Sequence, residues 1–206
     1  DSLLGSCYSL LYRQCLAGKV NWASKIRDIL FRYGFGWIWE NQSVLNVDHF
    51  LKIFSIRVKD CELQSWSSEI NDMSKLRMYC LFKEDRSSEL YLTLPIPRRL
   101  KIALARFRTG NHGLEIEIGR HHYVESKDRL CKICLSNNVV ACEDEIHVLY
   151  NCSAYNDVRS LYVSSESSSL YDFVTWMKSD NHYNLVNLAN FVYSIYNIRK
   201  QLLDVI

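Results

Sequence analysis

The chain has 206 residues, of which 48% are hydrophobic and 13% aromatic, and its formal net charge is +2. This apolar content excludes an intrinsically disordered protein, and the length is sufficient for one sizeable core or two small ones. Seven glycines and two prolines are few, which favours a helix-rich chain. No run approaches about 18 uninterrupted apolar residues, so we expect no membrane-spanning segment and no membrane partner.

Eight cysteines could form four disulfide bonds in a secreted protein. The apolar opening stretch Leu3–Tyr8 lacks the basic residues that precede a signal peptide, and Arg13 follows soon after it. We therefore expect free thiols in a reducing, intracellular compartment, in the nucleus and cytoplasm. Because the first residue is Asp1 rather than Met, we expect a piece of a longer protein.

Residues 1–90 have mostly helical periodicity, and we treat them as one helical section. Asn21 is placed to cap a helix that Gly34 ends, and Asp48 is placed to cap a second helix. The expected apolar stripes are Trp22, Ile26, Ile29, Leu30 and Tyr33 in the first helix, and Phe50, Leu51, Phe54 and Val58 in the second. We expect Trp37 and Trp39 in the core, with a base-stacking surface as the alternative.

The segment from Arg98 to Arg108 carries five cations and no acid, and Pro97 is suited to begin a helix there. Leu100, Leu104 and Phe107 form its apolar stripe. The cations expected to face solvent are Arg98, Lys101, Arg108 and one or both of Arg99 and Arg106. Such concentrated positive charge indicates contact with nucleic-acid phosphates. The alternative is a solvated face whose charges pair with acids elsewhere.

A short strand and a metal motif follow. The alternation of apolar and acidic residues in Leu114–Ile118 predicts a half-buried strand. Beyond it, Cys131-x2-Cys134 places two thiols at the ends of one tight turn, and His147 and Cys152 can return on a short helix. Three thiols and one imidazole at this spacing predict a tetrahedral zinc site, and four protein ligands leave no open position, so the ion is expected to be structural.

Cys142 lies between the two ligand pairs and could replace one of them. We expect it to be a spare thiol, because His147 and Cys152 share one short element and Cys142 precedes that element.

After the metal motif, Tyr155 and Arg159 are spaced to share a helix face, and Ser164–Ser169 is expected to be a loop. A final helix from about Asn184 has a strong apolar stripe of Leu185, Leu188, Phe191, Val192, Ile195 and Ile198. The predicted fold is mainly α, a helical domain with a small irregular or β zinc knuckle in the C-terminal half. Its expected sections are residues 1–90, 91–160 and 161–206.

The tract Leu104–Arg120 is followed by the Cys-x2-Cys pair and then by Glu143-Asp144-Glu145-Ile146-His147, Cys152, Tyr155 and Arg159. In this order the residues resemble the C-terminal region of invertebrate non-LTR retrotransposon polyproteins. A looser similarity to the stretch just after the reverse transcriptase extends to Tyr33–Phe35, Trp39–Gln42, Arg57–Asp60, Trp66 and Tyr79. The resemblance implies a Cys-Cys-His-Cys motif made of Cys131, Cys134, His147 and Cys152, which helps to hold element RNA or target DNA. It also implies an upstream reverse transcriptase domain of the same polyprotein as a partner.

We expect no catalytic activity, since a polymerase needs a pair of aspartates and the tract around Tyr155 offers only Asp157. The expected function is non-catalytic binding of RNA or DNA on a zinc-stabilised knuckle. The residues expected to contact phosphates are Arg98, Arg99, Lys101, Arg106, Arg108, Arg120, Lys127, Arg129 and Lys132. One alternative is a zinc-scaffolded protein-interaction module. Another is a zinc-activated water with Glu143 or Glu145 as its base.

Overall fold

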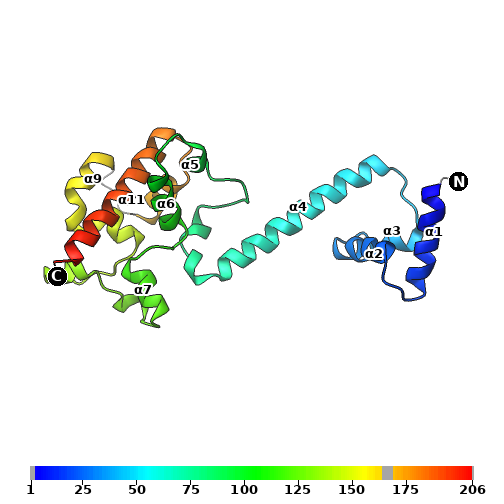
Figure 1. The fold of residues 1–206 in the computed structure, drawn as a ribbon, viewed down its shortest axis with the longest axis horizontal. Coiled ribbons are helices and arrows are strands. Elements are labelled where there is room, and N and C mark those ends of the chain that lie inside the picture. Colours follow the sequence, from blue (N-terminus) through cyan, green and yellow to red (C-terminus); the bar gives the residue numbers. More distant parts are fainter. Residues whose placement is uncertain (1–2, 164–168, 206) are drawn as a thin grey trace. The chain divides into compact units, whose positions relative to one another are not determined.

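The computed structural model describes residues 3–163 and 169–205. The regular secondary structure of these residues is helical, apart from one isolated antiparallel bridge between Leu130 and Cys142 (Figure 1). The expected mainly α fold is therefore confirmed, and the cysteine and histidine ligands lie in a small irregular region. None of the helices found in these residues combines the length and the apolar character that crossing a bilayer requires.

The chain divides into two units, residues 1–66 and 67–206. The first contains α1 (Leu3–Leu16), α2 (Trp22–Arg32), α3 (Gly36–Asn41) and most of α4 (Val47–Asp72). The second contains α5 (Leu90–Thr93), α6 (Arg98–Arg108), α7 (Glu115–His121), α8 (Lys132–Ser136), α9 (Asn156–Tyr162), α10 (Leu170–Met177) and α11 (His182–Leu203). Short turns of other helix types are η1 (Ser74–Leu76), η2 (Tyr79–Leu81), η3 (Ser126–Asp128), η4 (His147–Asn151) and η5 (Ser153–Tyr155).

In the first unit, α2 begins and ends as the sequence predicts. The side chain of Asn21 accepts a hydrogen bond from the Ser24 N–H at 3.2 Å, and Gly34 adopts a φ of +82° just beyond the helix. The core is centred on Ala23 and Leu30, so Trp22 and Ile29 lie at the edges of the apolar stripe and are exposed. The two tryptophans after α2 also separate: Trp39 is buried against Tyr12, whereas Trp37 is exposed.

Helix α4 starts before the predicted cap. The carboxamide oxygen of Asn46 accepts a hydrogen bond from the His49 N–H at 2.9 Å, so Asn46 rather than Asp48 caps the helix, and Asp48 lies in its first turn. The negative charge of Asp48 is still favourable there, because the N-terminal end of a helix carries partial positive charge. Phe50 and Phe54 pack on the first unit's core, whereas Leu51 is exposed.

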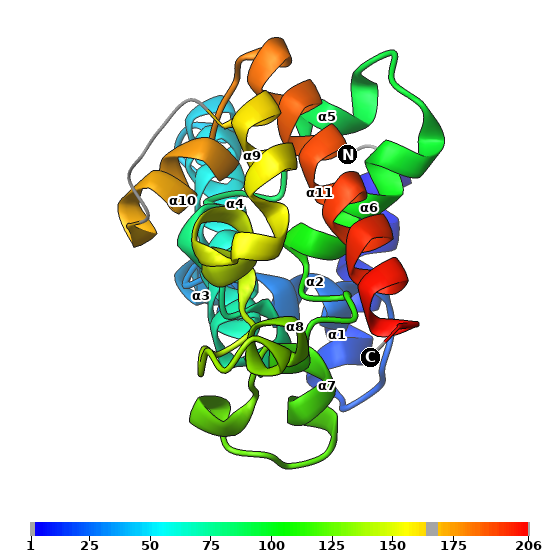
Figure 2. The same cartoon turned by 90° about the vertical axis from the view of Figure 1, so that its left-hand side faces the viewer.

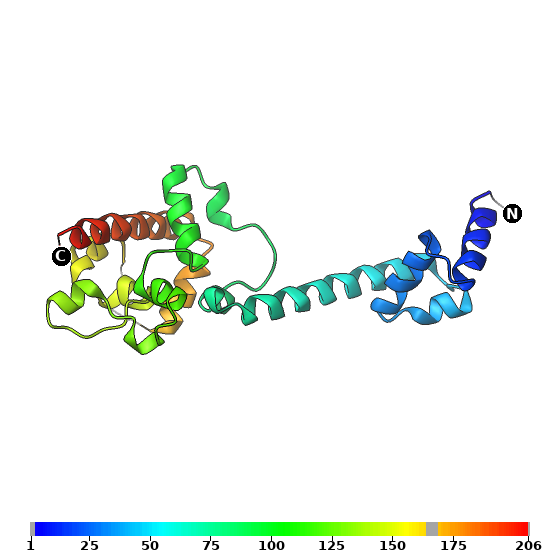
Figure 3. The same ribbon diagram turned by 60° about the horizontal axis from the view of Figure 1, so that its bottom comes forward.

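The second unit is built around α11, which lies between α9 and α6 (Figure 2). A view from another side shows the same helix against α6 (Figure 3). The side chain of Asn181 caps α11 by accepting hydrogen bonds from the N–H groups of Tyr183 and Asn184. The stripe predicted for this helix is buried at Leu185, Leu188, Phe191, Val192 and Ile195, and Ile198 is partly buried.

The strand predicted at Leu114–Ile118 is wrong: residues Glu115–His121 form α7. The strand prediction assumed that the acidic residues of the alternating pattern face water. A pattern of only five residues fits a strand and a short helix equally well once that assumption fails. Glu115 and Glu117 are both buried, and each pairs with a cation, Glu115 with Lys132 and Arg199 and Glu117 with Arg120. Both acids also lie in the first turn of α7, where the helix dipole favours negative charge.

The division of the chain differs from the expected sections at residues 90 and 160. The boundary lies between Trp66 and Ser67, and residues 91–160 and 161–206 belong to one unit because α11 packs against α6, α8 and α9. The loop expected at Ser164–Ser169 falls, except for its last residue, outside the described residues.

Candidate functional site

The four predicted metal ligands come together. The Sγ atoms of Cys131, Cys134 and Cys152 and a ring nitrogen of His147 all lie within 4.8 Å of one another, and all four residues are buried. The Sγ of Cys134 lies 3.6 Å from the Sγ of Cys152 and 3.4 Å from Nε2 of His147. In a tetrahedron with Zn–S bonds of about 2.3 Å, two sulfurs are about 3.8 Å apart, so the cluster has the size of a metal site.

Local structure explains how the ligands converge. Cys131 precedes α8 and Cys134 lies within it, so one short turn holds both thiols. The Cys131 N–H donates to the carbonyl of Ala141 at 2.8 Å, which fixes this turn beside the second half of the motif. His147 begins the π-helical turn η4, and Cys152 follows its last residue. The carboxylate of Asp144 caps this turn by accepting from the His147 N–H at 2.7 Å.

The three thiols ionise differently in the absence of a cation. Hydrogen bonds, chiefly from Cys152, stabilise the thiolate of Cys131 and lower its pKa, although burial opposes this shift. The hydrogen bond to Cys131, together with burial, raises the pKa of Cys152, and burial raises the pKa of Cys134. A cation bound among these thiols would favour the thiolate form of all three, because metal ligation requires deprotonated cysteines.

Cys142 does not belong to the cluster, as predicted. Its thiol donates to the carbonyl of Ser126 at 3.2 Å, and it is absent from the group of converging ligand atoms. Cys142 forms the isolated bridge with Leu130, so its backbone positions the motif while its side chain points elsewhere. All eight cysteines are free.

A buried ion network beside the metal ligands was not anticipated from the sequence. Arg199 of α11 donates from Nε and an Nη to the two carboxylate oxygens of Glu143, at 2.8 and 2.7 Å, and it also reaches Glu115 at 3.2 Å. Glu143 is 1% exposed, and one of its oxygens lies 3.9 Å from the Sγ of Cys131. Burial raises the pKa of Glu143, and Arg199 opposes this shift. Position 199 lies four residues after the buried Ile195, which is the signal that could have indicated an inward-facing arginine.

A second buried polar cluster connects Glu145, just before η4, with His112 in the turn after α6. Glu145 accepts from Nε2 of His112 at 3.1 Å, and it is paired with Arg77. The side chains of His112 and Glu145 are 0% and 2% exposed. Burial would raise the pKa of Glu145, but the hydrogen bond from His112 and the charge of Arg77 outweigh burial and lower it.

Helix α6 presents only part of its predicted cationic face. Arg98, Arg99 and Arg106 are exposed, and none of them forms an ion pair with a described residue. At about 100° per residue, these three positions span an arc of about 100° opposite Leu100, Leu104 and Phe107. The guanidinium of Arg99 lies 5.7 Å from the ring centroid of Tyr193, and Lys101 is partly buried, with its ammonium donating to the Leu92 carbonyl at 2.6 Å. The exposed arginines form what we call the α6 cationic face: Arg98, Arg99 and Arg106.

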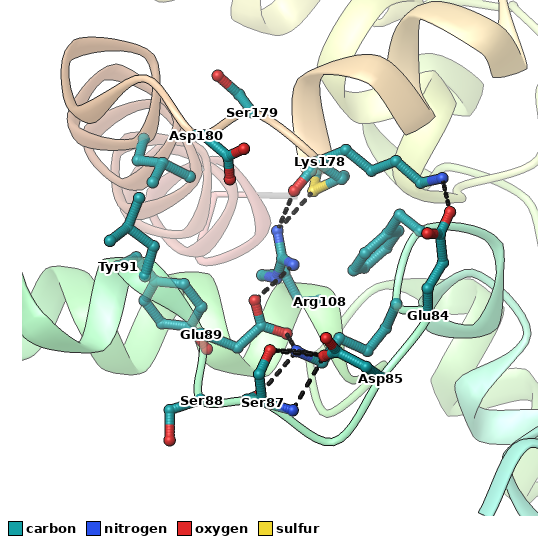
Figure 4. A pocket seen from close by; sticks show the side chains of 15 residues that line it. Glu84, Asp85, Ser87, Ser88, Glu89, Tyr91, Arg108, Lys178, Ser179 and Asp180 are labelled. Atoms are coloured by element: carbon teal, nitrogen blue, oxygen red, sulfur yellow. Dashed lines mark hydrogen bonds and ion pairs between the residues drawn. The ribbon is translucent and has the colours of Figure 1, made fainter. Parts of the chain in front are cut away.

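Arg108 is the clear exception, because it is 4% exposed and cannot contact a phosphate. Figure 4 shows its guanidinium pointing to Glu89, which it reaches at 2.9 Å, and a second Nη donates to the Met177 carbonyl at 2.6 Å. The ring of Phe82 lies 4.4 Å from the guanidinium. The expectation that Arg108 faces solvent is wrong because position 108 lies about 40° from Leu104 on the helix, on its buried side.

We expect Arg108→Gln to destabilise the second unit by about 2–3 kcal/mol, because Glu89 would lose the closer of its two cations and keep only Lys83 at 3.7 Å. Urea unfolding followed by circular dichroism measures this difference. Arg106→Gln, two residues away on the exposed side, is the matched control and should change the unfolding free energy by less than about 0.5 kcal/mol. Equal stability of the two variants would contradict a structural role for Arg108.

The other four predicted phosphate contacts are engaged within the chain. Arg120 pairs with Glu117 at 2.9 Å, and Arg129 donates to the carbonyls of Val124 and Ile116. Lys127 pairs with Glu125 at 2.9 Å and Lys132 with Glu115 at 2.8 Å, although both lysines remain exposed. The two lysines therefore already have carboxylate partners, and the guanidinium of Arg129 is used in hydrogen bonds to nearby backbone carbonyls.

The two carboxylates considered as bases, Glu143 and Glu145, are each paired with an arginine. The cluster of Cys131, Cys134, His147 and Cys152 could hold a metal ion. Comparisons of the chain with protein-family models, curated proteins and solved structures give no match.

Proposed function

We propose that this chain is a non-catalytic, zinc-stabilised region that binds RNA or DNA through phosphate contacts. The observation that carries the proposal is the α6 cationic face: three exposed arginines without an acidic partner among the described residues, on a helix packed into the same unit as the ligand cluster. Elsewhere in that unit, Lys127, Lys132 and Arg120 have carboxylate partners.

The ligand set favours zinc over other divalent ions. Three cysteines and one histidine are soft and borderline ligands, which zinc binds in tetrahedral geometry, whereas magnesium and calcium prefer oxygen ligands. All four residues are buried and no fifth position is left for water, so the ion would be structural. It would hold α8 and η4 together, and α8 packs against α11, which in turn packs against α6.

The α6 cationic face suits a backbone contact rather than base recognition. Arginine binds phosphate with a planar pair of donors, and its charge persists at every physiological pH. Arg98 and Arg106 are about 12 Å apart along the helix axis at 1.5 Å per residue, which allows separate phosphates to be contacted. Such binding discriminates little between sequences, because phosphates carry no sequence information.

The resemblance to non-LTR retrotransposon polyproteins gives this binding a biological setting. We propose that the chain follows the reverse transcriptase domain of such a polyprotein and helps to hold element RNA or target DNA near it. The upstream domain would be its protein partner, and the location would be the nucleus and cytoplasm. Free cysteines in the described structure are compatible with a reducing compartment.

The test is a fluorescence anisotropy titration of single-stranded RNA, duplex DNA and RNA–DNA heteroduplex at two salt concentrations. We expect Arg98→Gln, Arg99→Gln and Arg106→Gln together to weaken binding and to flatten the salt slope by roughly two to three contacts, because each neutralised phosphate releases counterions. The fold should be retained, since all three side chains are exposed.

The matched control changes the net charge by the same amount in the first unit, with Lys19→Gln, Lys25→Gln and Lys52→Gln, which are exposed lysines outside the site. This control should keep the salt slope of the unmodified chain. If both triple variants weaken binding equally, the α6 cationic face is not the contact surface. If the unmodified chain binds none of the three nucleic acids at low salt, the proposal fails and a zinc-scaffolded protein-interaction module is the better account.

A further inference from the structure

A cavity of about 390 Å³ lies in the second unit, outside the metal cluster, between the C-terminal ends of α6 and α11. This volume is within the range of small-ligand sites, about 300–1,000 Å³. Its charged walls hold three cations and one carboxylate, so the lining favours an anion. These charged residues are Arg106, Arg199, Lys200 and Asp204.

Two of the three cations are available to a ligand. Arg199 is occupied by Glu143 and Glu115 in the buried ion network. Arg106 and Lys200 are exposed and form no ion pair with a described residue. An anion entering the cavity would therefore meet an arginine from α6 and a lysine from α11 without displacing an existing carboxylate.

Two fully buried polar atoms belong to residues that line the same cavity and lack a hydrogen-bond partner among the described residues. These atoms are the hydroxyl oxygen of Tyr196 and Nδ1 of His112, whose Nε2 is bound to Glu145. A buried polar atom without a partner is costly, and the large majority of buried side-chain polar atoms in native proteins are hydrogen-bonded. An anionic ligand in the cavity would accept from the Tyr196 hydroxyl, whereas Nδ1 of His112 is an acceptor while Nε2 donates to Glu145 and would need a ligand group that donates, such as a phosphate hydroxyl.

We propose that this cavity binds a phosphate group, with Arg106 and Lys200 compensating its charge and the hydroxyl of Tyr196 donating a hydrogen bond. A phosphate fits this combination because its several oxygens accept from several donors at once, and an arginine can contact two of them. The group can belong to the end of a nucleic-acid strand or to a free nucleotide. Assigning the phosphate to the end of a nucleic-acid strand rests on the function proposed for the α6 cationic face. Binding of a phosphate group in the cavity does not depend on that function.

Tyr196→Phe is the most informative variant, because a structural role of the Tyr196 hydroxyl predicts a loss of stability, whereas a binding role predicts a loss of phosphate affinity. The substitution removes a buried hydroxyl that has no partner, so folding should be unchanged or slightly improved. The Kd of the full chain for inorganic phosphate, measured by calorimetry at constant ionic strength, should rise about tenfold, as expected for the loss of one hydrogen bond to a charged group. Lys200→Gln should also raise this Kd.

Tyr155→Phe is the matched control. Its hydroxyl is also buried and without a partner among the described residues, but Tyr155 does not line the cavity, so phosphate affinity should be unchanged. If the unmodified chain does not bind phosphate, or if its Kd is the same in Tyr196→Phe and Lys200→Gln, the proposal is overturned.

Two further arms identify the source of the phosphate and separate this site from the α6 cationic face. Tighter binding of a short RNA with a 5′-phosphate than of the same RNA without it, lost in Tyr196→Phe, assigns the cavity to a strand end. Equal binding of the two RNAs, with AMP bound and sensitive to Tyr196→Phe, assigns it to a free nucleotide.

Arg98→Gln should weaken RNA binding and leave phosphate binding intact. RNA binding without phosphate binding overturns the cavity site alone, and phosphate binding without RNA binding overturns the proposed function alone.

Discussion

Removal of the metal is expected to unfold the region between residues 125 and 160. The purified chain should contain about one zinc ion, and Cys134→Ser or His147→Ala should abolish metal binding together with local order. The reason is that all three cysteine ligands, with Val148 and Leu149 of η4, are part of the second unit's buried core. Binding energy of structural zinc sites is on the order of 10 kcal/mol, comparable to the stability of a whole domain.

Elemental analysis and hydrogen exchange on the same sample measure this result. In the Cys134→Ser chain, exchange should accelerate in α8, η4 and the parts of α9 and α11 that pack near them. Cys142→Ser is the matched control, because this thiol lies in the same region and binds the Ser126 carbonyl instead of joining the cluster, so metal content should be unchanged. A protected region 125–160 without bound metal, or disulfide bonds among these cysteines, would refute the zinc proposal.

The second large effect is expected from Arg199→Ala. This change leaves Glu143, which is 1% exposed, and Glu115 without the guanidinium that contacts both. Breaking a buried ion pair by removing one partner costs about 3–5 kcal/mol, because an uncompensated charge stays buried. Metal affinity should fall as well, since a carboxylate oxygen of Glu143 lies 3.9 Å from the Sγ of Cys131 and would repel a thiolate there.

Urea unfolding and a competition titration with a zinc chelator measure the two consequences. A double-mutant cycle with Glu143→Gln provides the control, since neutralising the carboxylate should remove much of the cost of losing Arg199. The two substitutions should therefore be clearly less than additive in their effect on stability. Additive effects would show that Arg199 acts through packing alone, and an unchanged metal affinity in Arg199→Ala would exclude an electrostatic role at the cluster.

Local sequence patterns were sufficient for α2, α11 and the ligand set, but not for α7, which was predicted as a strand. The capping residue Asn21 and the apolar stripe of α11 act over a few residues, so chain-local physics determines them. The same holds for Cys131 and Cys134, because two thiols on one turn must face one point. The assignment of Cys142 as a spare thiol followed from its position before η4 and is confirmed by its hydrogen bond to Ser126.

The roles of individual charged residues depended on the tertiary structure. Arg108 and Arg106 are two residues apart and chemically identical, but Phe82, Glu89 and Met177 bury the first, whereas the second is exposed. Arg199 meets Glu143 across 56 positions of sequence, which no local periodicity encodes. The sequence by itself therefore determined the mainly α fold and the four converging ligands. Only the tertiary structure decided which cations are available to a partner, because a charge is buried or exposed according to the neighbours that distant segments bring to it.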